Sequence, residues 1–265
     1  MASGKLLTDI RYFETDEPNL DGCNPQDPGN LLKLPKSHIF TGARIARKSR
    51  QLGLTIADKF DHVYINFTSA EEPGSIRFAS RSVDREDAWL RYVDVGVSFS
   101  KINQMTEVKK QAWLESITLD VMRLVVARSP NQLSIIDEVE SLVREFGEEL
   151  PIVHQIKETK SYSVAVFYRI APEMKKSTAW IKYHDKSSGL KRVGCFAKLQ
   201  FYEDILFLVS GISVSKGFIK LTPRPSYKAR LYNQRYKVPI EVDIESLLRL
   251  NRRMQFNHGL LADLQ

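Results

Sequence analysis

Seven cations and three tyrosines gather near the carboxyl end of the chain. Between Ile205 and Ile240 the sequence has no Asp or Glu, and its seven Lys and Arg residues equal the whole formal excess of +7. Three tyrosines are interspersed among the last of these cations. Rings and positive charges in alternation can contact a partner by stacking and by ion pairing. The partner-binding candidates are therefore Tyr227, Lys228, Arg230, Tyr232, Arg235, Tyr236 and Lys237.

Three interpretations of this segment stay open at the level of sequence. An extended chain of this composition binds single-stranded nucleic acid by stacking bases and neutralising phosphates. Tyr and Arg are also favoured at the hot spots of protein–protein interfaces. A plain sheet edge, protected by Lys and Arg against strand pairing, has the same composition. The segment carries no RNP-type motif and no G-x-x-G clamp that would single out nucleic acid.

Motifs for catalysis and for cofactor binding are missing from the sequence. No two of the five histidines are three or four residues apart, and neither H-E-x-x-H nor C-x-x-C occurs. Both phosphate-binding glycine motifs are absent, and the stretch Gly211-Ile-Ser213-Val-Ser215 lacks the last glycine of a nucleophile elbow. Cys195 alternates in phase with Val193 and Ala197, which predicts a core position. We expect no catalytic residue, no metal and no cofactor, and hence a binding protein and not an enzyme.

Period-2 alternation predicts strands in the first half of the chain. The segments 62–68 and 75–82 are joined by a Glu-Glu-Pro-Gly turn, and a third strand over 90–99 places Val93 and Val95 on one face. One buried and one solvated face suits an antiparallel meander. The spacing then becomes helical over 107–128, with Thr106 as N-cap, and again over 134–146.

Strands return in the second half, over 162–170, 178–184, 193–201, 205–214 and 218–221, and Asp243 is the expected N-cap of a last helix. This order indicates an α+β fold, with antiparallel sheets flanking a central helix pair and a C-terminal helix. Residues 1–33 are expected to form an irregular N-terminal arm, because Pro, Asn and Gly are frequent after residue 14. Residues 34–265 are expected to form a single domain, or two sub-halves that meet near residue 130.

Composition limits the class of protein further. The chain has 265 residues, of which 43% are hydrophobic and 27% charged, so it can bury a core and is not disordered. Its longest apolar run, 205–209, is much shorter than a membrane span, and no apolar leader follows Met1. Two distant cysteines make no disulfide framework. We expect a soluble, cytoplasmic protein without a transmembrane segment, whose oligomeric state the sequence leaves open.

One stretch of the chain has a familiar order of segments. The sequence Asp87-Ala-Trp89-Leu-Arg-Tyr-Val-Asp94-Val-Gly-Val97 precedes the two helices, and the strand over 162–170 precedes Thr178-Ala-Trp-Ile-Lys-Tyr-His-Asp185-Lys-Ser-Ser-Gly189. Over about residues 60–200 this pattern resembles the immunity proteins of bacterial polymorphic toxin systems. The resemblance implies a cytoplasmic, non-catalytic antitoxin that binds one cognate toxin protein and occludes it. It carries over no site residue by position.

The positive charge bears on which toxin such a protein would bind. A basic chain is expected to meet an acidic toxin surface, or else to use the acidic helix over 137–149. Two alternative functions remain. One is a nucleic-acid-binding protein that uses residues 216–237, and the other is a basic protein lining an anionic membrane, similar to a viral matrix protein.

Overall fold

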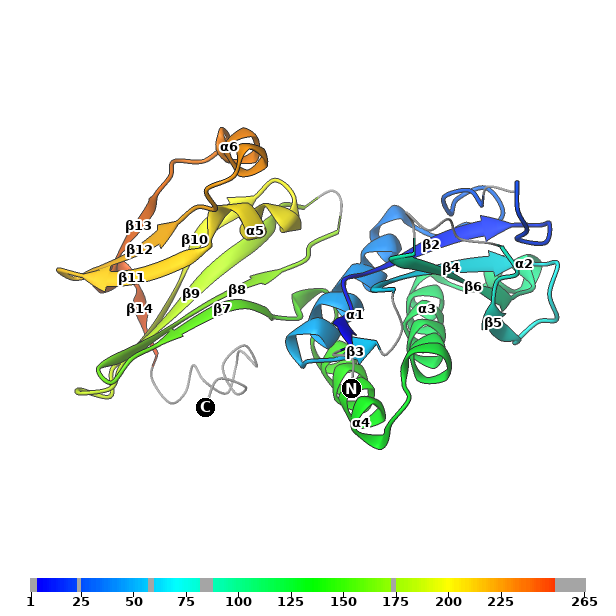
Figure 1. Ribbon diagram of the computed structural model, residues 1–265, viewed down its shortest axis with the longest axis horizontal. Coiled ribbons are helices and arrows are strands. Elements are labelled where there is room, and N and C mark those ends of the chain that lie inside the picture. The colour runs from blue at the N-terminus through cyan, green and yellow to red at the C-terminus, as the bar shows by residue number, and fades with distance from the viewer. Residues whose placement is uncertain (1–3, 23–24, 57–59, 82–87, 173–174, 251–265) are drawn as a thin grey trace. The chain divides into compact units, whose positions relative to one another are not determined.

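The computed structural model describes residues 4–22, 25–56, 60–81, 88–172 and 175–250, which form an α+β protein (Figure 1). The α+β class predicted from the sequence is confirmed. The chain divides into two compact units, Met1–Glu145 (unit 1) and Phe146–Gln265 (unit 2). The sequence left open a single domain over residues 34–265 or two sub-halves meeting near residue 130. Helix α4 (Pro130–Phe146) belongs almost wholly to unit 1.

Unit 1 contains a four-stranded sheet with the order β2-β4-β6-β5. The strands are β2 (Asp9–Thr15), β4 (His62–Thr68), β5 (Ile76–Phe78) and β6 (Leu90–Gly96). Strands β2, β4 and β6 are parallel, and only β5 is antiparallel to its neighbour. The expected antiparallel meander over 62–99 is therefore wrong in its strand directions. Alternation reports which face of a strand is buried, and it says nothing about the direction of the neighbouring strand.

The expected N-terminal arm over residues 1–33 also differs from the structure. Residues 9–15 form strand β2 of the sheet, and Lys5–Leu6 (β1) pairs with Thr55–Ile56 (β3). The side chain of Glu14 is buried and accepts backbone N–H groups from Asn30, Leu31 and Leu32 at 2.7–2.9 Å. A carboxylate with three such donors holds the irregular part of this segment against the sheet.

Two of the longer helices of unit 1 cover one face of its sheet. These are α1 (Phe40–Gln51) and α3 (Glu107–Val121), and the latter continues as the π-helical turn η3 (Met122–Val126). Tyr12 on β2 hydrogen-bonds Thr118 on α3 at 2.7 Å, and Phe67 on β4 packs on the ring of Trp113. The predicted N-cap of α3 is confirmed, because Thr106 Oγ1 accepts the N–H of Lys109. Short helices η1 (Lys36–Ile39) and α2 (Phe99–Asn103) complete the described helical part of this unit.

Unit 2 contains two antiparallel sheets. The first has the order β14-β10-β9-β8-β7, with β7 (Ile152–Glu158), β8 (Tyr162–Arg169), β9 (Ser177–Asp185), β10 (Lys191–Leu199) and β14 (Leu248–Arg249). The second has the order β11-β12-β13, with β11 (Gly211–Ser215), β12 (Phe218–Thr222) and β13 (Ile240–Asp243). Helices α5 (Ile205–Leu208) and α6 (Tyr227–Asn233) lie side by side on this unit (Figure 1). The 3₁₀ turns are η4 (Gly147–Glu149), η5 (Tyr202–Asp204) and η6 (Ile244–Ser246).

Two elements of unit 2 correct the sequence expectations. The strand expected over 205–214 starts with helix α5, and only its second part is strand. The helix expected after Asp243 is a 3₁₀ turn, although Asp243 does accept the N–H of Glu245 as a cap. Leu248 then pairs with Val193 of β10, and this ladder ends the helix. The rest of the expected C-terminal helix, beyond Leu250, lies outside the described residues.

A β-bulge in β10 reverses the expectation for Cys195. The register with β9 shifts between Cys195 and Ala197, so Phe196 has no partner across the ladder. An extra residue changes the phase of alternation, and side chains before and after it no longer share a face. Cys195 is consequently exposed, whereas Leu199 is buried. The predicted core position of this thiol is wrong.

Candidate functional site

The tyrosine-rich segment of unit 2 is a short helix and not an extended chain. Pro223 and Pro225 precede it, and Ser226 Oγ accepts the N–H of Ala229 at 3.1 Å as its N-cap. Ala229 is buried, and at the end of the helix Asn233 Nδ2 donates to the carbonyl of Phe207 at 3.0 Å. Capping and these two contacts fix α6 against α5. The expectation of an extended segment is therefore corrected.

The outer face of α6 exposes apolar and cationic side chains together. Tyr227 is 70% exposed and Leu231, one turn later, is 45% exposed. The guanidinium of Arg230 lies 6.0 Å from the ring centre of Tyr227, and Lys228 is also exposed. We call these four residues the α6 surface. Side chains at i and i+4 lie on one side of a helix, so Tyr227 and Leu231 can contact the same partner.

The other two candidate tyrosines are engaged within unit 2. Tyr232 is half-buried and stacks on Phe207, with ring centres 4.7 Å apart. The hydroxyl of Tyr236 donates to the buried carboxylate of Asp204 at 2.5 Å and accepts the N–H of Gln200 at 2.8 Å. Burial, together with the hydrogen bond to Asp204, raises the pKa of Tyr236 to about 12. These two rings support the fold, which leaves no row of free rings for stacking successive bases.

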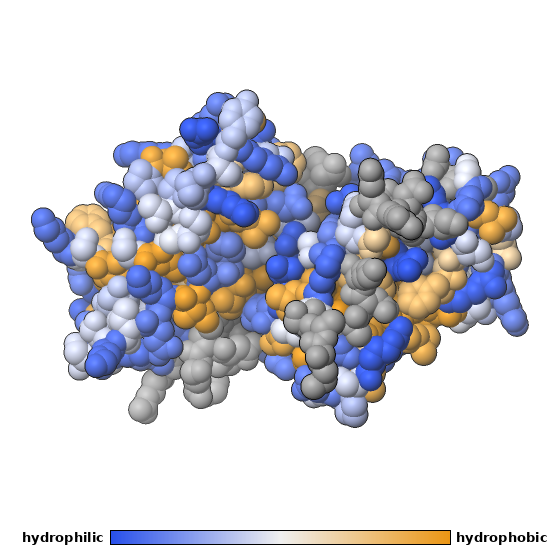
Figure 2. Space-filling model, in the orientation of Figure 1, coloured by the Kyte–Doolittle hydropathy of each residue, from blue (hydrophilic) through white to orange (hydrophobic). Residues whose placement is uncertain are grey.

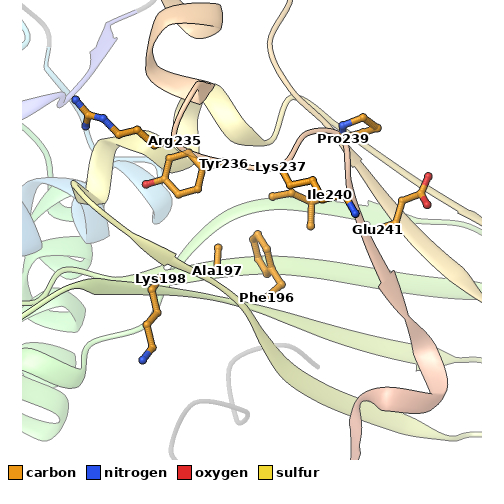
Figure 3. A pocket seen from close by; sticks show the side chains of 9 residues that line it. All are labelled: Phe196, Ala197, Lys198, Arg235, Tyr236, Lys237, Pro239, Ile240 and Glu241. Atoms are coloured by element: carbon orange, nitrogen blue, oxygen red, sulfur yellow. The ribbon is translucent and has the colours of Figure 1, made fainter.

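Arg235 and Lys237 border a groove in unit 2. The groove has a volume of about 370 Å³ and lies between β10 and the segment that leads into β13 (Figure 3). Its lining residues are Phe196, Ala197, Lys198, Arg235, Tyr236, Lys237, Pro239, Ile240 and Glu241. The guanidinium of Arg235 lies 5.7 Å from the ring centre of Phe201, which is itself 53% exposed. The structure thus separates the seven candidates into an exposed helix face, two internal anchors and two cations beside a groove.

Positive charge dominates this part of unit 2. Lys216, Lys220 and Arg224 are exposed as well, and Lys220 has Glu241 at 3.6 Å. The space-filling view shows hydrophobic and hydrophilic side chains interspersed over unit 2 (Figure 2).

The acidic helix α4 in unit 1 is less available as a contact surface. Arg123 pairs with Asp120, Asp137 and Glu140, and Arg144 pairs with Glu140 as well. These ion pairs neutralise part of the acidic face within the molecule. The acidic residues of α4 thus present less unpaired negative charge than the sequence alone indicates.

A cluster of aromatic side chains in unit 1 was not predicted from the sequence. Tyr64 contacts Phe13, Tyr92 and Trp89, with ring centres 5.1–6.3 Å apart. Arg11 lies 5.6 Å from the ring centre of Tyr64. The cluster occupies the face of the sheet opposite α1 and α3. Alternation did predict that Tyr92 and Val93 lie on opposite faces of their strand. The rings come together only because β2, β4 and β6 are parallel neighbours.

Among the described residues, no three His, Cys, Asp or Glu side chains lie close enough to bind a metal ion. No helix of the described segments combines the length and apolar character needed to cross a bilayer. No protein-family model matches the chain, and no similar curated protein or solved structure was found.

Proposed function

We propose that this chain is a non-catalytic binding protein that uses the α6 surface to hold a protein partner. The observation that carries the proposal is the joint exposure of Tyr227 and Leu231, one turn apart on a capped helix and flanked by Lys228 and Arg230. Tyr and Arg are enriched among residues that dominate binding energy. Burying the exposed Tyr and Leu surface contributes about 25 cal/mol per Å² before the costs of association.

The more specific proposal follows from the resemblance of residues 60–200 to immunity proteins. The partner is then a bacterial toxin domain, and the chain acts in the cytoplasm by covering the toxin's functional surface. The local excess of Lys and Arg favours a toxin that presents acidic groups at the contact. The engagement of Tyr232 and Tyr236 within unit 2 favours a protein partner over single-stranded nucleic acid.

Co-expression tests this proposal directly. The chain is expressed with the toxin-like product of a neighbouring gene, and growth and complex formation are followed. We expect restored growth and a stoichiometric complex, both of which are lost in a Tyr227→Ala, Leu231→Ala double variant. A Lys157→Ala variant is the control, because Lys157 is exposed on β7 at the opposite edge of the sheet from β14. Growth rescue that persists in the double variant would refute the role of α6.

A further inference from the structure

The groove lies between β10 of the first sheet of unit 2 and β13 of the second. Strand β14 pairs with β10 only at Arg192 and Val193. Beyond this pairing, β10 is bordered by the groove, and β13 borders it on the other side. In the described chain, β13 is the end strand of its sheet. The groove therefore lies between two strands that do not pair with each other in the described chain, and a groove of this kind can accept an extended peptide.

The bulge in β10 supplies the apolar floor of this groove. In a regular strand, consecutive side chains point to opposite faces. Here Phe196 and Ala197 point to the same side, toward the 235–241 segment, while Lys198 points away (Figure 3). Ile240 approaches Phe196 from the opposite wall. Bulges commonly re-aim side chains beside functional sites, and this one adds an aromatic ring to the groove.

Cations outnumber carboxylates along the same opening. The side chain of Lys237 extends beside Ile240, and Arg235 lies at the rim (Figure 3). Glu241 is the one acidic residue in the groove lining, and it has Lys220 at 3.6 Å. Tyr236 forms a rigid wall, because its hydroxyl is held by Asp204 and by the N–H of Gln200. An occupant of this groove meets an apolar floor and a positive rim.

We propose that the groove binds an extended acidic segment of the protein partner. An apolar side chain of that segment packs on Phe196 and Ile240, and a neighbouring carboxylate pairs with Lys237. Arg235 and Lys237 follow helix α6 (Tyr227–Asn233) directly in the chain. The inference rests on the proposed function and adds the chemistry of the partner.

Phage display tests whether the groove binds peptides, and it needs no knowledge of the partner. A random peptide library is selected against the immobilised full chain. The enriched peptides are expected to combine Asp or Glu with Leu, Phe or Trp. Their affinity is expected to fall about tenfold in Lys237→Glu and to remain unchanged in Lys157→Glu, the matched control on β7. Circular dichroism verifies that both variants are folded. Lys237→Gln removes the positive charge without introducing a negative one and is expected to give a smaller loss.

Several outcomes would overturn the inference. These are the absence of any enriched sequence, a basic consensus, peptide affinity that Lys237→Glu leaves unchanged, or displacement of the peptide by oligo(dT)12 at equal concentration. The experiments distinguish a wrong assignment of the groove as a peptide site from a wrong proposed function. If the partner complex depends on Tyr227 but not on Lys237, only the groove assignment is wrong. If acidic peptides bind but the affinity for the partner is unchanged in Tyr227→Ala, only the role assigned to the α6 surface is wrong.

Discussion

Tyr236 and Tyr227 show how neighbouring residues of one type perform different tasks. The hydroxyl of Tyr236 bonds to Asp204, a carboxylate that is fully buried and whose second oxygen lacks a hydrogen-bond partner among the described residues. Tyr227 projects from the surface with Arg230 beside its ring. A buried carboxylate depends strongly on its few donors, whereas an exposed ring is free to meet a partner.

Replacing Tyr236 by Phe is therefore expected to lower the free energy of unfolding. The change removes one donor to Asp204 and the acceptor of the Gln200 N–H, and we expect a loss of about 1–3 kcal/mol. Guanidinium denaturation measures it. Tyr227→Phe serves as the control, because its hydroxyl is exposed, and it is expected to change the stability by less than about 0.5 kcal/mol. An equal effect of the two changes would contradict the internal role of Tyr236.

Asp94 in unit 1 provides a pH-dependent prediction. Burial raises the pKa of Asp94, although Asn66 and Asn19 each donate a hydrogen bond to its Oδ1. The folded state thus holds this proton more tightly than the unfolded state. The contribution of Asp94 to stability is present below the unfolded pKa and is lost as pH rises through the folded pKa. Asn at this position does not ionise.

We accordingly expect the melting temperature of Asp94→Asn, relative to the original protein, to increase between pH 4 and pH 7. Scanning calorimetry of both proteins across this range tests the trend, and the subtraction cancels the titration of other groups. Glu17→Gln, at an exposed carboxylate, is measured in parallel as the control variant. A difference that decreases with pH would contradict the burial argument.

At the scale of elements, α6 depends on one serine. Ser226→Ala removes the hydroxyl that accepts the N–H of Ala229, and the loss of such a cap costs about 1 kcal/mol. We expect faster amide hydrogen exchange over residues 229–233 and weaker partner binding. Ser213→Ala, at an exposed position of β11, is expected to leave both unchanged. Unchanged exchange in α6 after loss of Ser226 would show that packing on α5 alone maintains the helix.

Some of the helices and strands could be predicted from local sequence patterns. Helix α3 begins at its predicted N-cap, and strands β8 and β9 match the alternation of their residues, because these signals depend only on neighbours in the chain. Helix α6 was missed because its Tyr and Lys residues were interpreted as an extended segment, although Ser226 carried the capping signal. The groove could not be predicted at all. It requires the bulge at Phe196 and the position of Ile240, which depend on pairing between distant segments.

At the scale of the whole molecule, the formal charge of +7 equals the count of cations between Ile205 and Ile240. If this segment meets an acidic partner, attraction accelerates encounter and salt screens it. We expect the association rate constant to fall about tenfold or more between 50 mM and 500 mM salt, with a smaller change in the dissociation rate. Biolayer interferometry at several salt concentrations measures both rates. A rate constant independent of salt would contradict an electrostatic contribution from this segment.

Tyr227 is the residue of the α6 surface on which the proposed binding of a protein partner depends most. Titration calorimetry of the purified toxin-like partner against the original chain, Tyr227→Ala and Lys157→Ala tests it most directly. Truncation of a hot-spot tyrosine costs about 2 kcal/mol or more, so we expect the Kd to rise about thirtyfold in Tyr227→Ala and to stay the same in Lys157→Ala. A folded Tyr227→Ala variant that binds the partner with unchanged Kd would contradict the account.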